Sequence, residues 1–237
     1  MKPFVFREFT VQQHKDVFRV GTDGVLLGAL CSVHHGTRVL EVGPGTGLIS
    51  LMIAQRNPQT TVVAVEINPE AAKIANDNFK NSKFHSRLEV IQDDYKSFES
   101  PNKFKLIVSN PPYFETNSSE KDAIARQQRE LSFENLIKKS KSLLSSDGIF
   151  SVIIPHSSAE YFTELCNRRG LILSHSINIY GSETLPPKRA ILEFGFQGKE
   201  LIEEKFVIED APRVYSRQYL EATKDFHVFK EGSTLVR

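Results

Sequence analysis

The chain has 237 residues, of which 25% are charged, and its formal net charge is +1. This balance excludes a strongly basic protein that binds nucleic acid over its whole surface, although a local basic face is compatible with it. The 2 cysteines lack CxxC spacing, which argues against a disulfide framework and against a structural zinc site. No apolar run reaches the ~20 residues of a membrane span, and the N-terminus lacks the apolar core of a signal peptide. We therefore expect a cytoplasmic protein with no metal and no membrane partner.

Strand-like and helix-like segments alternate along the middle of the chain. The expected strands are 38–42, 61–67, 87–92, 104–109, 149–155, 171–180 and 189–196. The expected helices are 48–56, 69–81, with Pro69 in its first turn, 133–144, with Ser132 as its N-cap, and 158–170. Near-continuous apolar strands between helices are typical of a parallel sheet covered on both faces. The last two strands are joined too closely for a parallel crossover, so they should be antiparallel.

The expected fold is therefore α/β: a doubly wound, Rossmann-like, seven-stranded sheet with an antiparallel last strand. We expect three parts: an N-terminal segment 1–36, a main domain 37–199, and a C-terminal extension 200–237 that packs on that domain. A long polar connection, 115–131, follows the fourth strand, and loops of that length are uncommon unless they are functional or disordered.

The first strand runs into a glycine turn, Glu41 to Gly47, with the sequence EVGPGTG. Glycines between a strand and a helix let the backbone approach a ligand at the carboxyl end of the sheet. The spacing of Gly43, Gly45 and Gly47 is GxGxG, which differs from the dinucleotide pattern GxGxxG. No GKS or GKT follows, so the turn is not a phosphate-binding P-loop.

Acidic residues end the next two strands. Glu66 ends the second strand, where a carboxylate can accept both ribose hydroxyls of a nucleoside. Asp93 and Asp94 end the third strand, and either could accept the amino group of an adenine. Acids beside a glycine turn that has no basic residue suit a nucleoside ligand without a pyrophosphate. S-adenosylmethionine, with its adenosine, sulfonium and α-amino group, meets that description.

The fourth strand ends abruptly in Asn110-Pro111-Pro112-Tyr113, followed by Phe114. The Asn110 side-chain oxygen and the Pro111 carbonyl could each accept one N–H of a conjugated amino group, such as adenine N6 or a glutamine amide. These bonds favour a tetrahedral nitrogen whose lone pair is free to attack, and the rigid prolines hold one acceptor still. Tyr113 and Phe114 offer faces for stacking a base, and the sequence does not distinguish which of them does so. The alternative is a plain strand stop with core-filling rings.

With EVGPGTG and NPPY together, the chain resembles class I S-adenosylmethionine-dependent methyltransferases. Residues 6–30, including VGTDGVLLG at 20–28, look like the N-terminal segment of the bacterial tRNA(Val) adenine-N6 methyltransferase family. That family modifies the adenosine 3′ of the anticodon. Residues 216–226, SRQYLEATKDF, are similar to the ending of the same family. The resemblance covers the whole chain and makes segment 1–36 a cap over the cofactor site and 37–199 the methyltransferase domain.

The resemblance implies roles by position. The glycines would line the methionine part of the cofactor, Glu66 would hold the ribose, and Asp94 is favoured over Asp93 for the adenine. Thr22 and Asp23 would lie over the cofactor, although both also fit as N-caps of the helix that follows. The implied cofactor-binding residues are Thr22, Asp23, Glu41, Gly43, Gly45, Gly47, Glu66, Asp94 and Asn110. The implied catalytic residues are Asn110, Pro111 and Tyr113.

Contacts with RNA should come from local charge. Residues 213–219 alternate basic and aromatic side chains, which suits phosphate pairing and base stacking but also a packed edge strand with a solvated basic side. The expected substrate-binding residues are Pro112, Phe114, Lys188, Arg189 and Arg217.

The expected function is therefore methyl transfer from S-adenosylmethionine to adenine N6 in tRNA, by a monomer. The alternatives are a glutamine N5 protein methyltransferase, a DNA adenine methyltransferase, and a non-catalytic RNA-binding protein that retains the cofactor fold. A glutamine enzyme usually has a helical N-terminal substrate domain, for which 36 residues are too few. The remaining length leaves no separate domain for recognising DNA, and a pure RNA binder needs neither NPPY nor the glycine turn.

Overall fold

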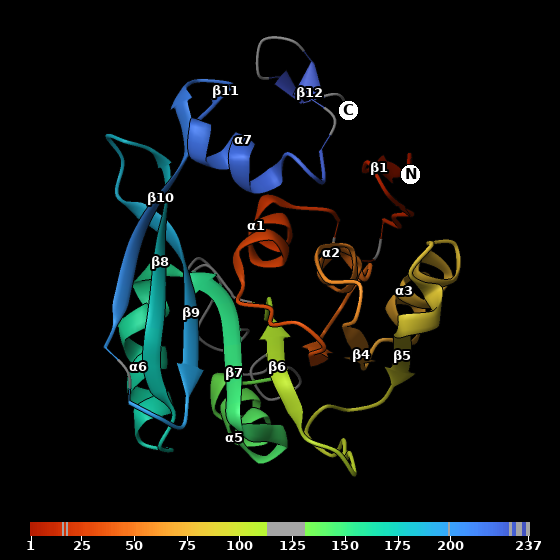
Figure 1. The fold of residues 1–237 in the computed structure, drawn as a ribbon, viewed down its shortest axis with the longest axis vertical. Helices are drawn as coiled ribbons and strands as arrows, with labels where there is room; N and C mark the ends of the chain where they lie inside the picture. The colour runs from red at the N-terminus through yellow and green to blue at the C-terminus, as the bar shows by residue number, and fades with distance from the viewer. Residues whose placement is uncertain are drawn as a thin grey trace, which may run out of the picture.

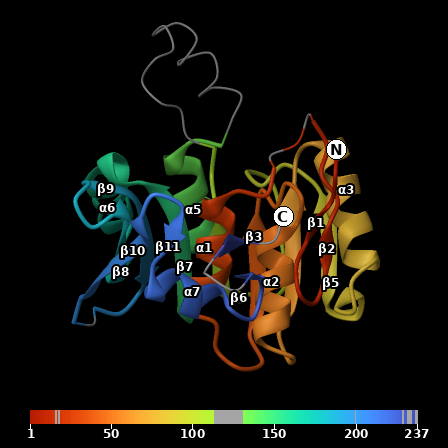
Figure 2. The same ribbon diagram turned by 90° about the horizontal axis from the view of Figure 1, so that it is seen from above.

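The structure is a computed structural model that describes residues 1–15, 17, 19–112, 131–198, 200–227, 229–230 and 234–235. Within the described residues, nine strands form one sheet in the spatial order β11-β10-β8-β9-β7-β6-β3-β4-β5. In chain order they are β3 (Arg38–Val42), β4 (Thr61–Glu66), β5 (Leu88–Gln92), β6 (Phe104–Ser109), β7 (Leu144–Pro155), β8 (Ile172–Ser182), β9 (Pro187–Gly195), β10 (Ile202–Ala211) and β11 (Val214–Tyr215). The sheet crosses the molecule from β8 and β10 on one side to β5 on the other (Figures 1 and 2).

The seven strands expected from the sequence, β3 to β9, are all present, and β9 runs antiparallel to both of its neighbours. The C-terminal extension then adds β10, parallel to β8, and β11, antiparallel to β10. The sequence analysis ended the sheet too early because β10 has few buried positions. Of its ten residues, only Phe206 and Val207 are buried.

The helices cover both faces of the sheet (Figure 1). They are α1 (Thr22–Leu30), α2 (Leu48–Arg56), α3 (Pro69–Lys80), α5 (Phe133–Leu143), α6 (Ala159–Asn167) and α7 (Arg217–Thr223), with short 3-10 turns at His85–Arg87 and His156–Ser158. Successive residues of β7 show the two layers: Val152 and Ile154 join the core under α5 and α6, whereas Ile153 joins the core under α1, α2 and α7. Ser132 caps α5 as expected, through a 3.2 Å bond from the Asn135 N–H.

Two glycines allow α1 to lie close against α2. A Cβ on Gly28 would come within 2.8 Å of the Met52 sulfur, and one on Gly24 within 3.2 Å of a Leu48 methyl carbon. Both glycines belong to the VGTDGVLLG stretch. That stretch therefore has a packing role in addition to any role at a ligand site.

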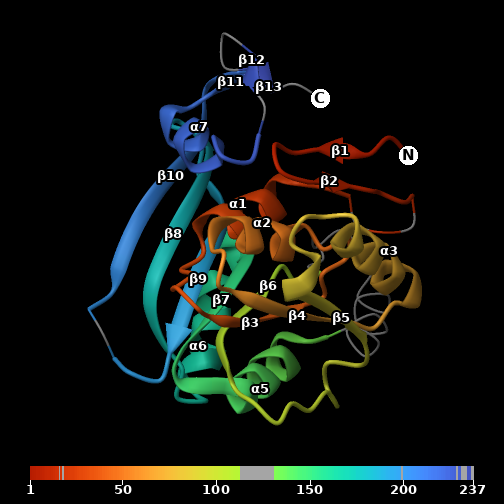
Figure 3. The same ribbon diagram turned by 45° about the vertical axis from the view of Figure 1, so that its right-hand side comes forward.

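The two ends of the chain meet beside the sheet. Strands β1 (Phe4–Val5) and β2 (Thr10–Val11) form an antiparallel hairpin, and β12 (Phe229–Lys230) pairs with β13 (Thr234–Leu235). Figure 3 shows the N-terminal hairpin near the C-terminal segment. The Arg7 N–H donates to the Phe226 carbonyl and its Nε donates to the His227 carbonyl, both at 2.9 Å. The two segments specific to the resembled family thus support one another.

Candidate active site

The glycine turn and the Asn-Pro-Pro segment lie at adjacent strand ends. Val42, the last residue of β3, is the register partner of Ser109, the last residue of β6. The Ser109 hydroxyl donates a 3.0 Å hydrogen bond to the Val42 carbonyl. Gly43 and Asn110 follow directly in the chain, so the two motifs leave the sheet side by side at its carboxyl edge.

The glycine turn has a backbone that other residues would strain. Gly43, Gly45 and Gly47 have φ values of 69°, 56° and 79°. A Cβ on Gly47 would lie 2.5 Å from a ring carbon of Phe79, whereas a Cβ on Gly43 would meet nothing within 4 Å. The open space at Gly43 is what a turn that accommodates a ligand should have.

Glu66, at the end of β4, is oriented by two backbone donors. Its Oε2 accepts from the Gly45 N–H at 3.1 Å, and its Oε1 accepts from the Asn68 N–H at 2.9 Å. Each carboxylate oxygen keeps further acceptor capacity, as two ribose hydroxyls would need.

Glu41 is buried directly beneath the turn, with 1% of its surface exposed. One oxygen, Oε2, accepts from the N–H and hydroxyl of Ser50 on α2, and the other, Oε1, has no partner among the described residues. Burial raises the pKa of Glu41 to about 7, hydrogen bonds from Ser50 oppose that rise, and the charge of Glu66 adds to it. An unpartnered buried carboxylate oxygen suits a cationic group of a ligand.

Asp93 and Asp94, which follow β5, have different hydrogen-bond partners. Asp94 Oδ1 accepts from the Lys96 N–H at 2.9 Å, and its Oδ2 lies 3.3 Å from the Lys96 ammonium. Asp93 Oδ1 accepts from the Asp94 N–H at 2.8 Å, and its own N–H bonds to the Glu66 carbonyl, which ties it to the end of β4. Both follow β5, the strand next to β4, so they lie at the same edge of the sheet as Glu66.

Two residues that the sequence analysis missed belong to this region. Ile67 directly follows Glu66 and is 58% exposed, although it continues a buried strand. An exposed isoleucine at this position offers an apolar surface for a flat ring. The sequence indicated it only by its position next to Glu66, the residue expected to bind the ribose. Asn78, 1% exposed in α3, bonds to the Gln12 N–H, the Gln12 carbonyl and the Thr46 carbonyl, at 2.8, 3.1 and 2.9 Å. Its burial is visible only in the structure, and the same helix also contains Asn76, so nothing in the sequence distinguished Asn78.

The structure describes only part of the segment 110–114, which carries the expected catalytic residues. Asn110 is half-buried, Pro111 is buried and Pro112 is exposed. Tyr113 and Phe114 lie outside the described residues. The assigned roles of these two aromatic residues therefore remain predictions.

Thr22 and Asp23 begin α1 but do not cap it. The N-cap is Gly21, and no side-chain capping bond is present, so the capping alternative was wrong. Asp23 Oδ2 instead accepts a 2.9 Å hydrogen bond from Arg189 Nε on β9. A residue expected at the cofactor is thus paired with one expected at the RNA.

In the alternating segment 213–219, only Ser216 and Tyr219 are buried, and both arginines are exposed. Tyr219 is 4% exposed and stacks on Tyr215 with ring centroids 4.4 Å apart, so its ring belongs to the core and cannot take a base. Arg217, behind the N-cap Ser216 of α7, is exposed, as is Lys188 at the start of β9. Tyr219 is therefore packed, as the alternative expected, but in helix α7; the edge strand β11 covers only Val214–Tyr215.

The described residues contain neither a cluster suited to a metal ion nor a helix suited to a membrane. In the ranges that the structure describes, no group of three or more His, Cys, Asp or Glu side chains is placed to hold a metal ion. No helix in those same ranges is long and apolar enough to cross a membrane.

The residues at this edge fit S-adenosylmethionine. Glu41, two residues before Gly43, has an unpartnered oxygen that would accept an α-amino group, and the open space at Gly43 would leave room for the methionine part. Glu66, Asp93 and Asp94 provide acceptors for an adenosine, and exposed Ile67 provides an apolar surface beside them. The glycine turn itself, 43–47, contains no basic residue that would favour a pyrophosphate.

Comparison with known proteins agrees with this geometry. The model of the family described as "Methyltransferase small domain" matches residues 8–167. A protein of Flavobacteriaceae bacterium strain 3519-10, named tRNA1(Val) (adenine(37)-N6)-methyltransferase, is 55% identical over 97% of this chain and 100% of its own length. A Bacteroides thetaiotaomicron protein of the same name is 38% identical over 95% of this chain and 97% of its own.

Solved structures support the fold. A predicted O-methyltransferase from Agrobacterium tumefaciens superposes with a TM-score of 0.70 at 20% identity, covering 86% of this chain and 96% of its own. The P. horikoshii protein TYW2, in complex with MeSAdo, superposes with a TM-score of 0.60 at 16% identity, covering 82% of this chain and 71% of its own. The fold is that of class I S-adenosylmethionine-dependent methyltransferases. The Flavobacteriaceae and Bacteroides thetaiotaomicron relatives are 55% and 38% identical to the chain over nearly its full length. The chain therefore belongs to the methyltransferase small domain family and, within it, to the tRNA1(Val) (adenine(37)-N6)-methyltransferases.

Proposed function

We propose that this protein transfers the methyl group of S-adenosylmethionine to the exocyclic N6 of adenosine 37 in tRNA1(Val), the nucleotide 3′ of the anticodon. The named substrate of the near full-length relatives supports this proposal. The chemistry is supported by the chain's own residues at the carboxyl edge of the sheet.

One observation carries the proposal. The bond between Ser109 and Val42 places Asn110 and Gly43 at adjacent strand ends, so an acceptor for an amino group lies beside the cofactor turn. Neither motif alone specifies an enzyme that methylates an amino group. Their adjacency supports a site in which the amino-group acceptor would lie beside the methyl donor.

The cofactor would be held by groups at successive strand ends. Glu66 would accept the ribose hydroxyls, Asp93 or Asp94 the adenine amino group, and Glu41 the α-amino group, while Ile67 would pack on the adenine. S-adenosylmethionine, when bound, supplies a methyl group on a positively charged sulfur. The acids also favour the cationic part of the cofactor electrostatically.

The substrate amine would be activated without a general base. Its lone pair is delocalised into the adenine ring, which makes the nitrogen a poor nucleophile. The Asn110 side-chain oxygen and the Pro111 carbonyl would each accept one N–H, which favours the tetrahedral nitrogen formed as the methyl transfers. The methylated nitrogen is briefly cationic and loses its proton readily. Tyr113 or Phe114 would stack the adenine, which is worth ~1–3 kcal/mol.

The RNA would be held by exposed charge near this edge. Lys188 is the second residue of β9 and precedes Arg189, the register partner of Pro155 at the end of β7; Arg217 begins α7. Exposed cations of this kind pair with phosphates and make binding salt-dependent. We infer in addition that the protein acts in the cytoplasm, where its tRNA substrate is found, as a monomer without a metal.

The test is a methyl-transfer assay with labelled S-adenosylmethionine and three acceptors: unmodified tRNA1(Val), duplex DNA and a release factor. Products are digested and the methylated species identified by mass. Matched tRNA with guanosine at position 37 is the control acceptor. We expect N6-methyladenosine from the unmodified tRNA alone.

Label in the release factor would refute the RNA assignment and support a glutamine enzyme instead. Label in the guanosine-37 tRNA would refute the assigned nucleotide. Absence of label in all acceptors, with the cofactor still bound, would refute the proposed substrate.

A further inference from the structure

An ion pair joins the N-terminal end of helix α1 to strand β9. Arg189 Nε donates to Asp23 Oδ2 at 2.9 Å, and the two side chains are 25% and 24% exposed. A partly buried, charge-assisted bond of this kind constrains its partners more than a freely solvated pair does. The residues it joins are 166 positions apart in the chain.

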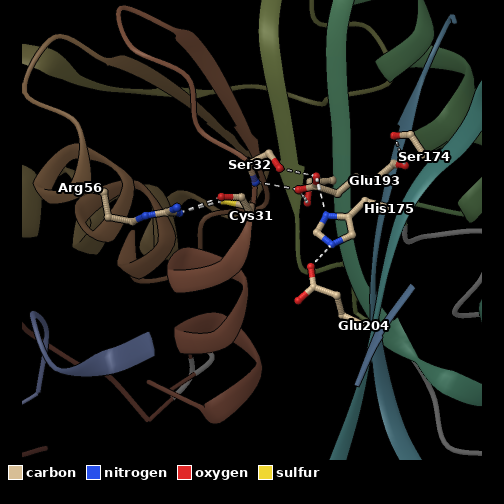
Figure 4. A network of polar contacts seen from close by, with 8 residues as sticks. Cys31, Ser32, Arg56, Ser174, His175, Glu193 and Glu204 are labelled. Carbon is tan, nitrogen blue, oxygen red and sulfur yellow. Dashed lines mark hydrogen bonds and ion pairs between the residues drawn. The ribbon is translucent and has the colours of Figure 1, made fainter. Parts of the chain in front are cut away.

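The other end of α1 is attached to the same strand. Glu193 of β9, 2% exposed, accepts from the Ser32 N–H at 2.8 Å and from the Ser32 hydroxyl at 2.6 Å, just beyond the C-cap of α1. Ser151 of β7 and His175 of β8 also contact Glu193, at 3.1 and 3.4 Å, and His175 Nε2 lies 2.7 Å from Glu204 of β10. Figure 4 shows this network converging on Glu193 from several elements.

The spacing of the two attachments matches along the helix and along the strand. Asp23 and Ser32 are nine positions apart, which is about 13.5 Å at the rise of an α-helix. Arg189 and Glu193 are four positions apart, which is about 13.5 Å along a strand, and they point to the same face of the sheet. Two charged side chains of β9 therefore hold α1 along the strand at both ends.

We infer that Arg189 and Glu193 are positioning residues that hold α1 so that Thr22 and Asp23 stand at the cofactor site. This inference rests on the cofactor site of the proposed function. Gly24 of α1 packs on Leu48, with 3.2 Å between an added Cβ and a Leu48 methyl carbon, and Leu48 directly follows the glycine turn, so the start of α1 lies beside that turn. It assigns Arg189 a role different from the RNA contact that the sequence analysis expected. Through Asp23, Arg189 sets the affinity for S-adenosylmethionine, and the RNA is bound by other cations.

The test is a double-mutant cycle of Arg189→Gln and Asp23→Asn, with folding checked by thermal unfolding. Equilibrium dialysis with labelled S-adenosylmethionine gives cofactor dissociation constants. Filter binding of tRNA at several salt concentrations gives RNA affinity and its salt slope. We expect Arg189→Gln to raise the cofactor dissociation constant about five- to tenfold and to raise it no further in the Asp23→Asn background. The tRNA dissociation constant and its salt slope should stay unchanged.

A second variant tests the attachment at the C-terminal end of α1. Ser32→Ala removes the hydroxyl bond to Glu193 but leaves the backbone bond, and it should weaken cofactor binding by about two- to fivefold. The matched control is Arg168→Gln, which breaks the exposed 3.2 Å pair with Glu164 on α6 and should leave cofactor binding unchanged.

Opposite results would overturn the inference. A raised tRNA dissociation constant with a salt slope lower by about one unit, and unchanged cofactor binding, would assign Arg189 to the RNA. Additive effects of Arg189→Gln and Asp23→Asn would show that Arg189 does not act through Asp23. Unchanged cofactor binding in both Arg189→Gln and Ser32→Ala would remove the positioning role. Failure of the wild-type protein to bind S-adenosylmethionine would instead refute the proposed function.

Discussion

Replacing Glu41 by glutamine should stabilise the protein and weaken its cofactor binding. Glu41 is fully buried, and burial raises its pKa from 4.5 to about 7. The folded state therefore binds a proton more readily than the unfolded state, and stability falls as the pH rises from 4.5 to about 7. Above that range the buried carboxylate costs about 3 kcal/mol relative to a neutral group. Glutamine keeps the shape and the acceptor for Ser50 but removes this cost.

The stability of the glutamine variant should depend on pH in a defined way. At pH 8 its melting temperature should exceed that of the wild type by about 6–12 °C, because a domain of this size shifts about 2–4 °C per kcal/mol. Near pH 4.5 the wild-type carboxyl is protonated in both states, so the difference should vanish. Thermal unfolding monitored by circular dichroism across this range measures both ends.

Cofactor binding should change in the opposite direction. A positively charged α-amino group pairs with the carboxylate form of Glu41, and at pH 6 only about a tenth of a group with a pKa of about 7 is ionised. The wild-type dissociation constant for S-adenosylmethionine should therefore be about tenfold higher at pH 6 than at pH 8. The glutamine variant should bind about tenfold to a hundredfold more weakly at pH 8, with that pH dependence gone. A variant that binds like the wild type at both pH values would refute the placement of Glu41 at the cofactor.

Three further predictions concern single residues. Asn110→Ala should lower single-turnover methyl transfer by about a hundredfold or more with cofactor affinity within about twofold, and a fully active variant would exclude Asn110 from the mechanism. Gly28→Val should lower the free energy of unfolding by about 1–3 kcal/mol in urea, because its side chain meets Met52, whereas Gly181→Ala, with nothing within 4 Å of the added carbon, should be near neutral. The bond from Glu193 raises the pKa of His175, so the stabilisation by protonated His175 is present below pH 6.5 and lost as the pH rises through the folded value. His175→Gln should flatten that part of the stability curve, and an unchanged curve would contradict the reasoning.

Local patterns were enough to locate the strand ends at which the candidate site residues lie. Each of Gly43, Glu66 and Asn110 follows or ends a short apolar strand, and parallel strands present their carboxyl ends at one edge of a sheet. The cap of α5 by Ser132 was likewise predictable, because a capping bond spans only three positions.

Contacts between distant segments were not predictable in this way. Asp23 and Arg189 were assigned to different ligands, and their pairing depends on how α1 packs along β9. Tyr219 was expected as a possible stacking residue, but α7 turns its ring into the core against Tyr215. Strand β10 reads as a polar segment because only Phe206 and Val207 are buried, and their burial depends on packing with distant elements rather than on local pattern.

The amino-acid sequence by itself determined the kind of sheet, the glycine turn, the acids at the strand ends and the Asn-Pro-Pro acceptor. Each of these follows from residues close together in the chain, whose backbone conformations and side-chain periodicity are set locally. Only the tertiary structure decided that Glu41 keeps one unpartnered oxygen under the turn, and that Arg189 and Glu193 hold both ends of α1. Those features arise where elements far apart in the chain pack together, because burial and hydrogen-bond partners depend on that packing.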